Sequence, residues 1–366
     1  MNPFFPEIKK NFGFGMMRLP MNGENVNLKL TEAMVTNFLA AGFNYFDTAH
    51  PYLKGQSETA VRDCLTSKYP RNSYVLADKL SGSCFETREE IRPLFEKQLE
   101  KCGVEYFDFY LMHALSAQRH EKYTETHAYD IAQELKAEGK IRHVGFSFHD
   151  SAEVLDKILT DRPEMEFVQL QFNYVDYEDP NVESRACYEV CRKHGKPVFV
   201  MEPVKGGSLV NLPRKALDMM TGGSPASYAI RYAAGFEGIA MVLSGMSDEA
   251  QLLDNIRFMK NFKPLSEEEH EMIAKVRTLY QAQHRIPCTA CRYCTDGCPA
   301  GIPIPELFAW ANEKHAKDGK PEKEYSGFEV NGSACVGCGQ CEQACPQHLH
   351  IRELLKEVDQ AFGGKL

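Results

Sequence analysis

The sequence predicts an α/β protein in which a TIM-type (β/α)8 barrel precedes a small, mainly helical domain rich in cysteine. Between about residues 12 and 260, eight short apolar runs alternate with amphipathic helical stretches, a pattern typical of βα units around a parallel sheet. Near the carboxyl end, two runs of four cysteines share one spacing. We therefore expect a barrel domain at residues 1–262, a linker helix at 263–286 and a second domain at 287–366.

Eight segments are the expected barrel strands, because each is short, apolar and rich in β-branched or aromatic residues. They are GFGMMRL, FNYFDTA, YVLADKL, FDFYLMHA, HVGFSF, FVQLQFN, PVFVME and GIAMVLSG. A doubly wound open sheet is the alternative, but no GxGxxG sequence follows an early strand.

Capping signals mark the starts of three helices. Glu90 follows Thr87 at the spacing of a capping box, and so does Glu269 after Ser266, where we expect the linker helix to begin. Ser224 lies directly before a proline, which suits a cap followed by proline at the first helical position.

Composition and charge limit the classes of function. Hydrophobic residues at 43% and charged residues at 25% are typical of a globular protein. A net charge of −9 disfavours nucleic acid as a partner, because such binding depends on clustered Lys and Arg. No segment has the hydrophobic length of a signal peptide core or a membrane span. We expect a cytoplasmic protein, in which 13 cysteines indicate metal or redox chemistry rather than disulfides.

The two cysteine runs each read C-x2-C-x2-C-x3-C-P. At this spacing one loop binds three irons of a cubane, and the cysteine before proline reaches the neighbouring cluster. We therefore assign one 4Fe-4S cluster to Cys288, Cys291, Cys294 and Cys345, and the other to Cys335, Cys338, Cys341 and Cys298. Two zinc sites are the alternative, although this spacing is unusual for zinc. The region resembles the dicluster domain of bacterial-type ferredoxins, with a helical insert, PELFAWANEKHAK, between the runs.

Four polar residues lie at or just beyond the carboxyl ends of predicted strands, where this fold places its chemistry. They are Asp47, Tyr52, Lys79 and His113. Taken singly, each also has an ordinary interpretation, respectively as a turn cap, one of 16 tyrosines, an internal ion pair and a buried core imidazole. Taken together, they predict a catalytic site.

The chemistry of this set begins with the phenol, whose pKa is normally near 10. Lys79 beside Tyr52 would lower that pKa, and bringing it to about 7 would require about 4 kcal/mol of differential interaction. Asp47 would keep the ammonium charged, and His113 would donate a hydrogen bond to a carbonyl oxygen that gains charge. The expected reaction is hydride transfer to or from a carbonyl carbon, with Tyr52 as general acid or base.

These residues resemble a known family. The stretch DTAHPYLKGQSE is similar to the D-T-A-x-x-Y-G-x-G-x-S-E element of the aldo/keto reductases, and Lys79 and His113 match the rest of that family's Asp-Tyr-Lys-His tetrad. GKIRHVGFSF, VQLQFN and SGMSDEAQLLDNI resemble later family elements, so the likeness covers nearly all of residues 12–260. With the cysteine runs, it indicates the subgroup with a C-terminal ferredoxin-type dicluster domain.

The resemblance implies a nicotinamide nucleotide, NAD(P), as cofactor. Ser147 and Gln169 match positions that hold the carboxamide. The last βα turn supplies the positions expected at the adenosine end of the nucleotide: Gly245, Gln251, Asp254 and Asn255.

A further nucleotide contact is expected in EPVKGG. Lys205 would bind the pyrophosphate, and Gly206 would permit close backbone approach. A solvated loop lysine is the alternative interpretation.

Several positions depart from the family pattern. Phe148 stands where the family usually has Asn, and Met201 stands where an aromatic ring commonly stacks on nicotinamide. Leu53 replaces the glycine after the catalytic tyrosine. Gln251 occupies the position of an arginine that binds the 2′-phosphate in many members, so these residues favour neither NADP nor NAD.

Electron counting raises a further expectation. Nicotinamide moves two electrons at once and each cubane moves one, so we expect a flavin, in the barrel or on a partner, to convert between them. The expected partners are a small carbonyl or alcohol substrate and a ferredoxin or flavoprotein. The alternative function is an electron-transfer or redox-sensing module whose barrel is a non-catalytic docking platform.

Overall fold

The computed structural model describes residues 2–283, 285–316 and 324–362. They form two compact units. The first comprises Met1–Val204 and Met220–Ala274, and the second comprises Lys205–Met219 and Lys275–Leu366. The segment between Val204 and Met220 thus folds with the second unit although it lies within the sequence of the barrel.

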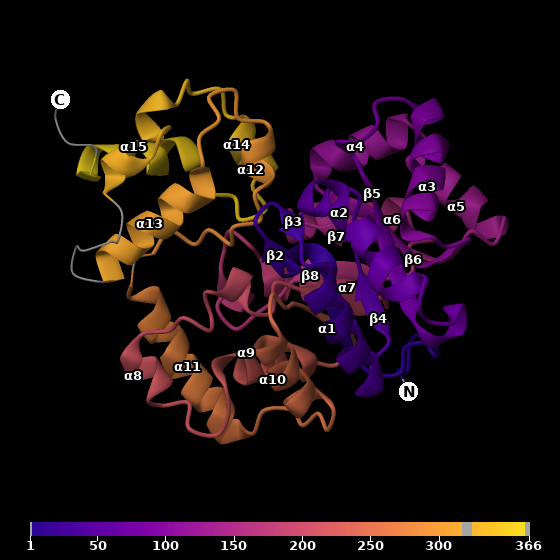
Figure 1. Cartoon of the computed structure of the whole chain (residues 1–366), viewed down its shortest axis with the longest axis horizontal. Coiled ribbons are helices and arrows are strands. Elements are labelled where there is room, and N and C mark those ends of the chain that lie inside the picture. The colour runs from indigo at the N-terminus through magenta and orange to yellow at the C-terminus, as the bar shows by residue number, and fades with distance from the viewer. Residues whose placement is uncertain (1, 284, 317–323, 363–366) are drawn as a thin grey trace. The chain divides into compact units, whose positions relative to one another are not determined.

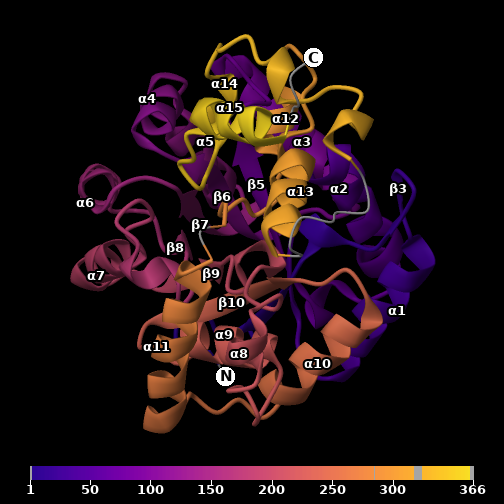
Figure 2. The same cartoon turned by 90° about the vertical axis from the view of Figure 1, so that its left-hand side faces the viewer.

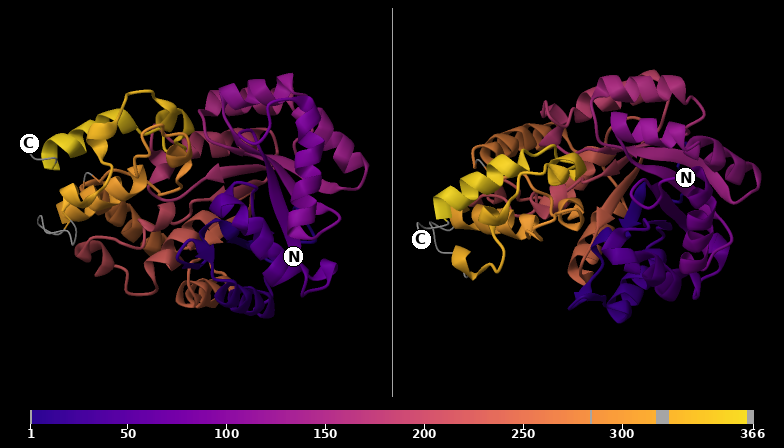
Figure 3. Two further views of the ribbon diagram at one scale, coloured as in Figure 1. Left: turned by 45° about the horizontal axis from the view of Figure 1, so that its top comes forward. Right: turned by 90° about the horizontal axis from the view of Figure 1, so that it is seen from above.

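The first unit is a closed barrel of eight parallel strands in the order β1-β10-β9-β8-β7-β6-β5-β4. All eight predicted strands are present, as β1 Phe12–Gly15, β4 Tyr45–Asp47, β5 Val75–Ser81, β6 Phe107–Leu115, β7 Ile141–Phe148, β8 Val168–Gln171, β9 Val198–Met201 and β10 Ile239–Gly245. Figure 3 shows these strands side by side with helices outside them. A short hairpin, β2 Met21–Asn22 with β3 Asn25–Val26, follows β1.

Three helices, α3, α9 and α11, begin at the capping signals described above, and Figure 1 labels them. Thr87 and Glu90 form a reciprocal capping box at α3, and Ser224 accepts a hydrogen bond from the third helical residue of α9. Ser266 and Glu269 cap α11 in the same reciprocal way. The bounds are α1 Leu28–Ala40, α2 Gln56–Val61, α3 Arg88–Cys102, α4 Ala117–Glu125, α5 Ala128–Ala137, α6 Ala152–Asp161, α7 Ser184–Lys193, α8 Arg214–Leu217, α9 Pro225–Ala234, α10 Glu249–Met259 and α11 Glu267–Gln281.

The inside of the barrel is filled by aromatic and aliphatic side chains, and the N-terminal segment closes its base. Phe5 is 5% exposed and packs edge-on against Phe109, Phe167 and Phe199 at centroid distances of 5.0, 6.0 and 5.7 Å. Asn2 donates to the carbonyl of Ala240 at the start of β10. The filled base leaves the carboxyl ends of the strands as the end where a site can open.

The second unit contains two structural repeats around its apolar core (Figure 2). A short helix lies inside each cysteine run and a longer one follows it. The bounds are α12 Tyr293–Asp296, α13 Ile304–Ala316, α14 Gln340–Ala344 and α15 Ile351–Phe362. The predicted helical insert is α13, and Lys317 at its predicted end lies outside the described residues. No helix in the described ranges is both long and apolar enough to cross a membrane.

Candidate active site and cluster sites

The predicted tetrad is brought together at the carboxyl ends of β4, β5 and β6. Lys79 donates to Asp47 Oδ1 at 2.6 Å and to the carbonyl of Thr48 at 2.7 Å. Both charged side chains are buried, with 0% and 4% of their side-chain surfaces exposed. Burial raises the pKa of Asp47, while the Lys79 ammonium acts against this effect. The pair therefore holds a cation at a fixed point inside the barrel end.

Tyr52 and His113 lie beside this pair. The Lys79 Nζ lies 4.9 Å from the centroid of the Tyr52 ring, and the Tyr52 and His113 rings meet edge to face at 5.9 Å. Burial, followed by the nearby Lys79 charge, lowers the pKa of His113 well below its usual value. The imidazole is therefore neutral at pH 7. A neutral imidazole can donate a hydrogen bond to a carbonyl oxygen and leave the proton transfer to another group.

Ser81 fixes the orientation of that imidazole. Its Oγ lies 2.6 Å from His113 Nδ1, and the two residues are register partners on β5 and β6. If the Ser81 hydroxyl donates to Nδ1, the ring hydrogen is on Nε2. Sequence inspection missed Ser81, because serine at a strand end carries no distinctive signal.

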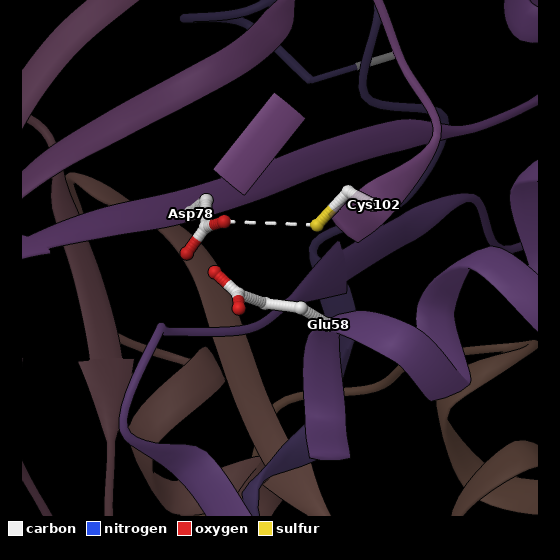
Figure 4. A group of neighbouring side chains, drawn as sticks. All are labelled: Glu58, Asp78 and Cys102. Carbon is white, nitrogen blue, oxygen red and sulfur yellow. Dashed lines mark hydrogen bonds between the residues drawn. The ribbon is translucent and has the colours of Figure 1, made fainter. Parts of the chain in front are cut away.

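A buried group of acids and a thiol lies on the outer side of β5 (Figure 4). Cys102 donates to Asp78 Oδ2 at 3.7 Å, and Asp78 Oδ1 accepts from the backbone N–H of Lys79 at 2.8 Å. Burial and the neighbouring Glu58 charge raise the pKa of Asp78 well above its usual value. Glu58 itself contacts His50 and Lys101. These contacts hold β5 in place where it carries Lys79.

The residues predicted at the nicotinamide carboxamide are neighbours. Ser147 and Gln169 are register partners on β7 and β8, and each is at most 3% exposed. The amide nitrogen of Gln169 contacts the sulfur of Met201 at 3.5 Å. Its buried Oε1 has no hydrogen-bond partner among the described residues. An unpaired buried acceptor is costly, and a carboxamide N–H₂ is a donor that fits it.

The residues predicted at the adenosine end lie at the end of β10 and on α10. Gln251 accepts from Ser247 N–H and donates to Asp248 Oδ2 at 2.9 Å in each case, so its amide completes the cap of α10. Asp254 accepts from Ser224 Oγ, and Asn255 donates to Ser244 Oγ at 2.9 Å. Gly245, which pairs with Gly15, packs beneath the side chain of Arg18, where a Cβ would lie 3.2 Å from it.

The eight cluster cysteines gather around two separate cavities of the second unit. The first cavity is lined by Cys288, Cys291 and Cys294 of one run and by Cys345 of the other. Burial, with the adjacent thiols of Cys291 and Cys288, raises the pKa of Cys294. Crowded thiols of this kind ionise readily only when a metal cation compensates their charge. The donor set therefore fits an iron–sulfur cluster.

The second cavity has the reciprocal lining. Cys335, Cys338 and Cys341 come from the second run and Cys298 from the first. The remaining lining is apolar apart from Arg352 and the backbone of a glycine. The structure thus groups the thiols in the same two sets that the spacing predicts.

Lys205 and Gly206, predicted at the pyrophosphate, belong to the second unit, so the structure does not group them with the other nucleotide residues. The Lys205 amine donates to Gln347 Oε1 at 3.3 Å, and its residue is only 3% exposed. It is therefore a buried lysine rather than a solvated one. Its partner, Gln347, was not identified from the sequence, because residues 142 positions apart share no local pattern.

Comparisons with known proteins cover both units. The profile of the aldo/keto reductase family matches residues 11–278, and the profile of the 4Fe-4S dicluster domain matches residues 287–349. The NADH-specific methylglyoxal reductase of Escherichia coli K12 is 28% identical over 204 residues, 51% of this chain and 59% of that protein. The alpha 1 subunit of an acetyl-CoA decarbonylase/synthase complex of Methanosarcina barkeri is 29% identical over 73 residues, 20% of this chain and 8% of that protein. The match thus spans less than two thirds of the length of either relative.

Solved structures show the same barrel. An aldo-keto reductase of Klebsiella pneumoniae in complex with NADPH has a TM-score of 0.60 at 19% identity, covering 73% of this chain and 90% of that one. One of Bacillus halodurans, in its holo form, has a TM-score of 0.58 at 23% identity, covering 73% and 91%. The family profile, the barrel and the two cysteine cavities agree with one another. The chain belongs to the aldo/keto reductase family and has a 4Fe-4S dicluster domain C-terminal to its barrel.

Proposed function

We propose that the chain interconverts a carbonyl compound and its alcohol by hydride transfer at the carboxyl end of the barrel. The two 4Fe-4S clusters exchange electrons with that site or with a redox partner. The observation that supports this function most directly is the buried Lys79–Asp47 pair with Tyr52 and His113 around it.

Each member of the tetrad has a role that its contacts support. The Lys79 ammonium favours the phenolate of Tyr52 and so makes that hydroxyl a better acid, because a nearby cation stabilises the ionised form. Asp47 and the Thr48 carbonyl orient the ammonium. His113 donates from Nε2 to the carbonyl oxygen as negative charge develops there. Tyr52 then gives its proton to that oxygen, and in the reverse direction it accepts the proton from the alcohol.

The nucleotide half of the proposal depends on Ser147 and Gln169. A bound nicotinamide would supply or accept the hydride, two electrons and one proton nucleus in a single step. Gln169 Oε1 would accept a hydrogen bond from the carboxamide, which would satisfy this buried atom. Asp254 and Asn255 remain candidates for the adenosine end.

The clusters require an electron converter in this scheme. Each 4Fe-4S cluster passes one electron, whereas hydride carries two, and a flavin can work in both modes. We propose a flavin in this chain or on a flavoprotein partner, with a ferredoxin as a second class of partner. Flavin absorbance of the anaerobically purified chain distinguishes the two arrangements. Iron and sulfide analysis should give about eight of each per chain for two cubanes.

The experiment that tests the catalytic role is Tyr52→Phe. We expect turnover of accepted aldehydes with NADH or NADPH to fall by about 10²- to 10⁴-fold, the usual contribution of a positioned general acid. Tyr69→Phe is a matched control, because it removes a phenol that bonds to Thr36 at the surface. Iron content and visible spectrum should be the same in both variants.

The second candidate function is an electron-transfer or redox-sensing module with an inactive barrel. The observation in its favour is the altered nicotinamide position, where Met201 contacts Gln169 through its sulfur. Unchanged turnover in Tyr52→Phe would reject the catalytic proposal. If the clusters of that variant are still reduced by a flavoprotein donor, the module is the remaining function.

A further inference from the structure

The segment 205–219 contacts two residues that line the first cysteine cavity, Thr289 and Gln347. Although it lies between β9 and α9 in the sequence, it folds within the second unit. Tyr280 donates to Ser208 Oγ at 3.0 Å, and Arg285 donates to the carbonyl of Asn211 at 3.3 Å. These bonds fix the segment beside the first cysteine run.

Near the start of this segment, Gly206 packs against Thr289, the residue that follows Cys288. A Cβ added at Gly206 would lie 2.5 Å from the carbonyl oxygen and 2.7 Å from the Cα of Thr289. The φ angle of Gly206 is +62°, a conformation that side chains rarely adopt. Glycine at this position therefore permits a backbone contact between the segment and a ligand loop.

Lys205 makes the equivalent contact with the other ligand run. Its ammonium donates to Gln347, two residues beyond Cys345, and both residues are buried, at 3% and 6% exposure. Gln347 lines the first cavity together with Cys288, Cys291, Cys294 and Cys345. Lys205 and Gly206 thus contact both of the chain segments that supply ligands to this cavity.

The second cavity has a different cationic neighbour. Arg352 lines it, and its side chain is 49% exposed. Water therefore screens this charge. A buried ammonium is screened much less by solvent. The two cavities therefore differ in their electrostatic surroundings although their cysteine spacing is identical.

We propose that Lys205 is a positioning and redox-tuning residue, whose buried ammonium orients Gln347 beside Cys345 and raises the reduction potential of the cluster bound by Cys288, Cys291, Cys294 and Cys345. Reduction adds negative charge to a cluster, and a nearby cation stabilises that charge. The two clusters then have separate potentials, with the tuned cluster the easier to reduce on account of Lys205. The inference rests on the cluster assignment in the proposed function.

The test is an EPR-monitored redox titration of the full-length, anaerobically purified protein. Iron and sulfide analysis of the unaltered protein comes first, and absence of clusters would reject the proposed function rather than this inference alone. With clusters present, Lys205→Met should move one of the two midpoint potentials to a more negative value and leave the other in place. Lys205→Arg should restore the potential toward that of the unaltered protein.

Lys215→Met is the matched control. This lysine lies in the same segment but is exposed, so its removal should shift neither potential. Unchanged potentials in Lys205→Met, or equal shifts of both, would overturn the inference. If Lys205→Met loses about half of its iron, Lys205→Arg distinguishes the explanations. Full iron content with the original potentials in Lys205→Arg supports the role of the cation. The same loss of iron in Lys205→Arg overturns it.

Discussion

The three residues after Tyr52, the proposed general acid, have left-handed backbone angles. Leu53 has φ 54°, Lys54 has φ 56° and Gly55 has φ +83°. A non-glycine residue in this conformation costs about 1–2 kcal/mol, because its Cβ approaches the following carbonyl oxygen. The family's usual glycine at position 53 would avoid this cost. The turn that presents Tyr52 is therefore maintained here by the surrounding structure rather than by local preference.

A pair of substitutions at position 53 isolates this strain. We expect Leu53→Gly to have a free energy of unfolding about 1 kcal/mol greater than Leu53→Ala, because only alanine retains the Cβ. The order is the reverse of that at an ordinary helical position, where alanine is favoured over glycine. Urea denaturation of both variants measures the difference. A more stable alanine variant would show that the left-handed turn is not strained.

Ser81 offers a second test at the scale of single residues. Without its hydroxyl, His113 loses the contact that fixes its ring, so we expect Ser81→Ala to lower kcat about tenfold with little change in KM. Ser81→Thr, which retains a hydroxyl, should recover most of the rate. An equal fall in Ser81→Thr and Ser81→Ala would argue against the hydrogen bond.

Burial, and after it the Lys79 charge, lowers the pKa of His113 well below 6.5. The pH profile of the unaltered protein should therefore show no ionisation of this histidine between about pH 6 and 8.

At the scale of elements, the connections after the strands determine how the two sites are built. The connection after β9 contributes the segment 205–219 to the second unit, whereas the connection after β10 remains with the barrel and forms α10. Two adjacent glycines, Gly206 and Gly207, begin the first of these, with φ +62° and +96°. Their surroundings differ, because a Cβ added at Gly207 would have no atom of the described residues within 4 Å.

This difference predicts unequal effects of alanine at the two glycines. Both substitutions introduce backbone strain of about 1 kcal/mol or more. Gly206→Ala adds a collision with the Thr289 backbone, so it should cost at least about 1 kcal/mol more and reduce the iron content of the purified chain. Thermal unfolding monitored by the visible absorbance of the clusters measures the effect. Equal melting temperatures and equal iron content would contradict the contact.

At the scale of the whole molecule, one ionic group ties the N-terminal segment to the base of the barrel. His143 on β7 lies 2.6 Å from Glu7 and 2.8 Å from Glu166, and Lys136 also contacts Glu166 at 2.6 Å. Burial acts to lower the pKa of His143, but Glu166 and Glu7 raise it to about 9. Burial acts to raise the pKa of Glu166, but His143 and Lys136 bring it down to about 2.

These pKa values predict how stability depends on pH. The folded-state pKa of His143 lies above its unfolded value of 6.5, so its contribution is complete below about pH 6.5 and is lost as pH rises toward 9. The loss is on the order of 3 kcal/mol, because the folded and unfolded pKa values differ by about 2.5. Glu166 acts in the opposite range, because its contribution, present above about pH 4.5, is lost as pH falls toward 2. Urea unfolding at pH 6, 7.5 and 9 tests the first range, and His143→Gln should remove most of the slope there.

The fold and the cysteine sets could be predicted because both are encoded in short segments. Each barrel strand is a continuous apolar run, and all eight are where the sequence places them. The capping boxes at Thr87 and Ser266 depend on residues three positions apart. The tetrad could be predicted because parallel strands of one barrel carry their carboxyl ends to the same side. The closing of the barrel base by the N-terminal segment could not be predicted, because Phe5 packs against Phe109, which lies more than a hundred positions away in the sequence.

The sequence by itself determined the barrel, the duplicated cysteine spacing and the residue types of the tetrad, because helix and strand periodicity and metal-ligand spacing are local properties. Only the tertiary structure decided that Lys205 is buried beside Gln347, that Ser81 contacts His113 and that Gln169 Oε1 lacks a hydrogen-bond partner among the described residues. Such contacts depend on which distant segments meet. Folding brings those segments together through the burial of apolar surface. This driving force is non-directional, so no local sequence pattern shows which distant segments will meet.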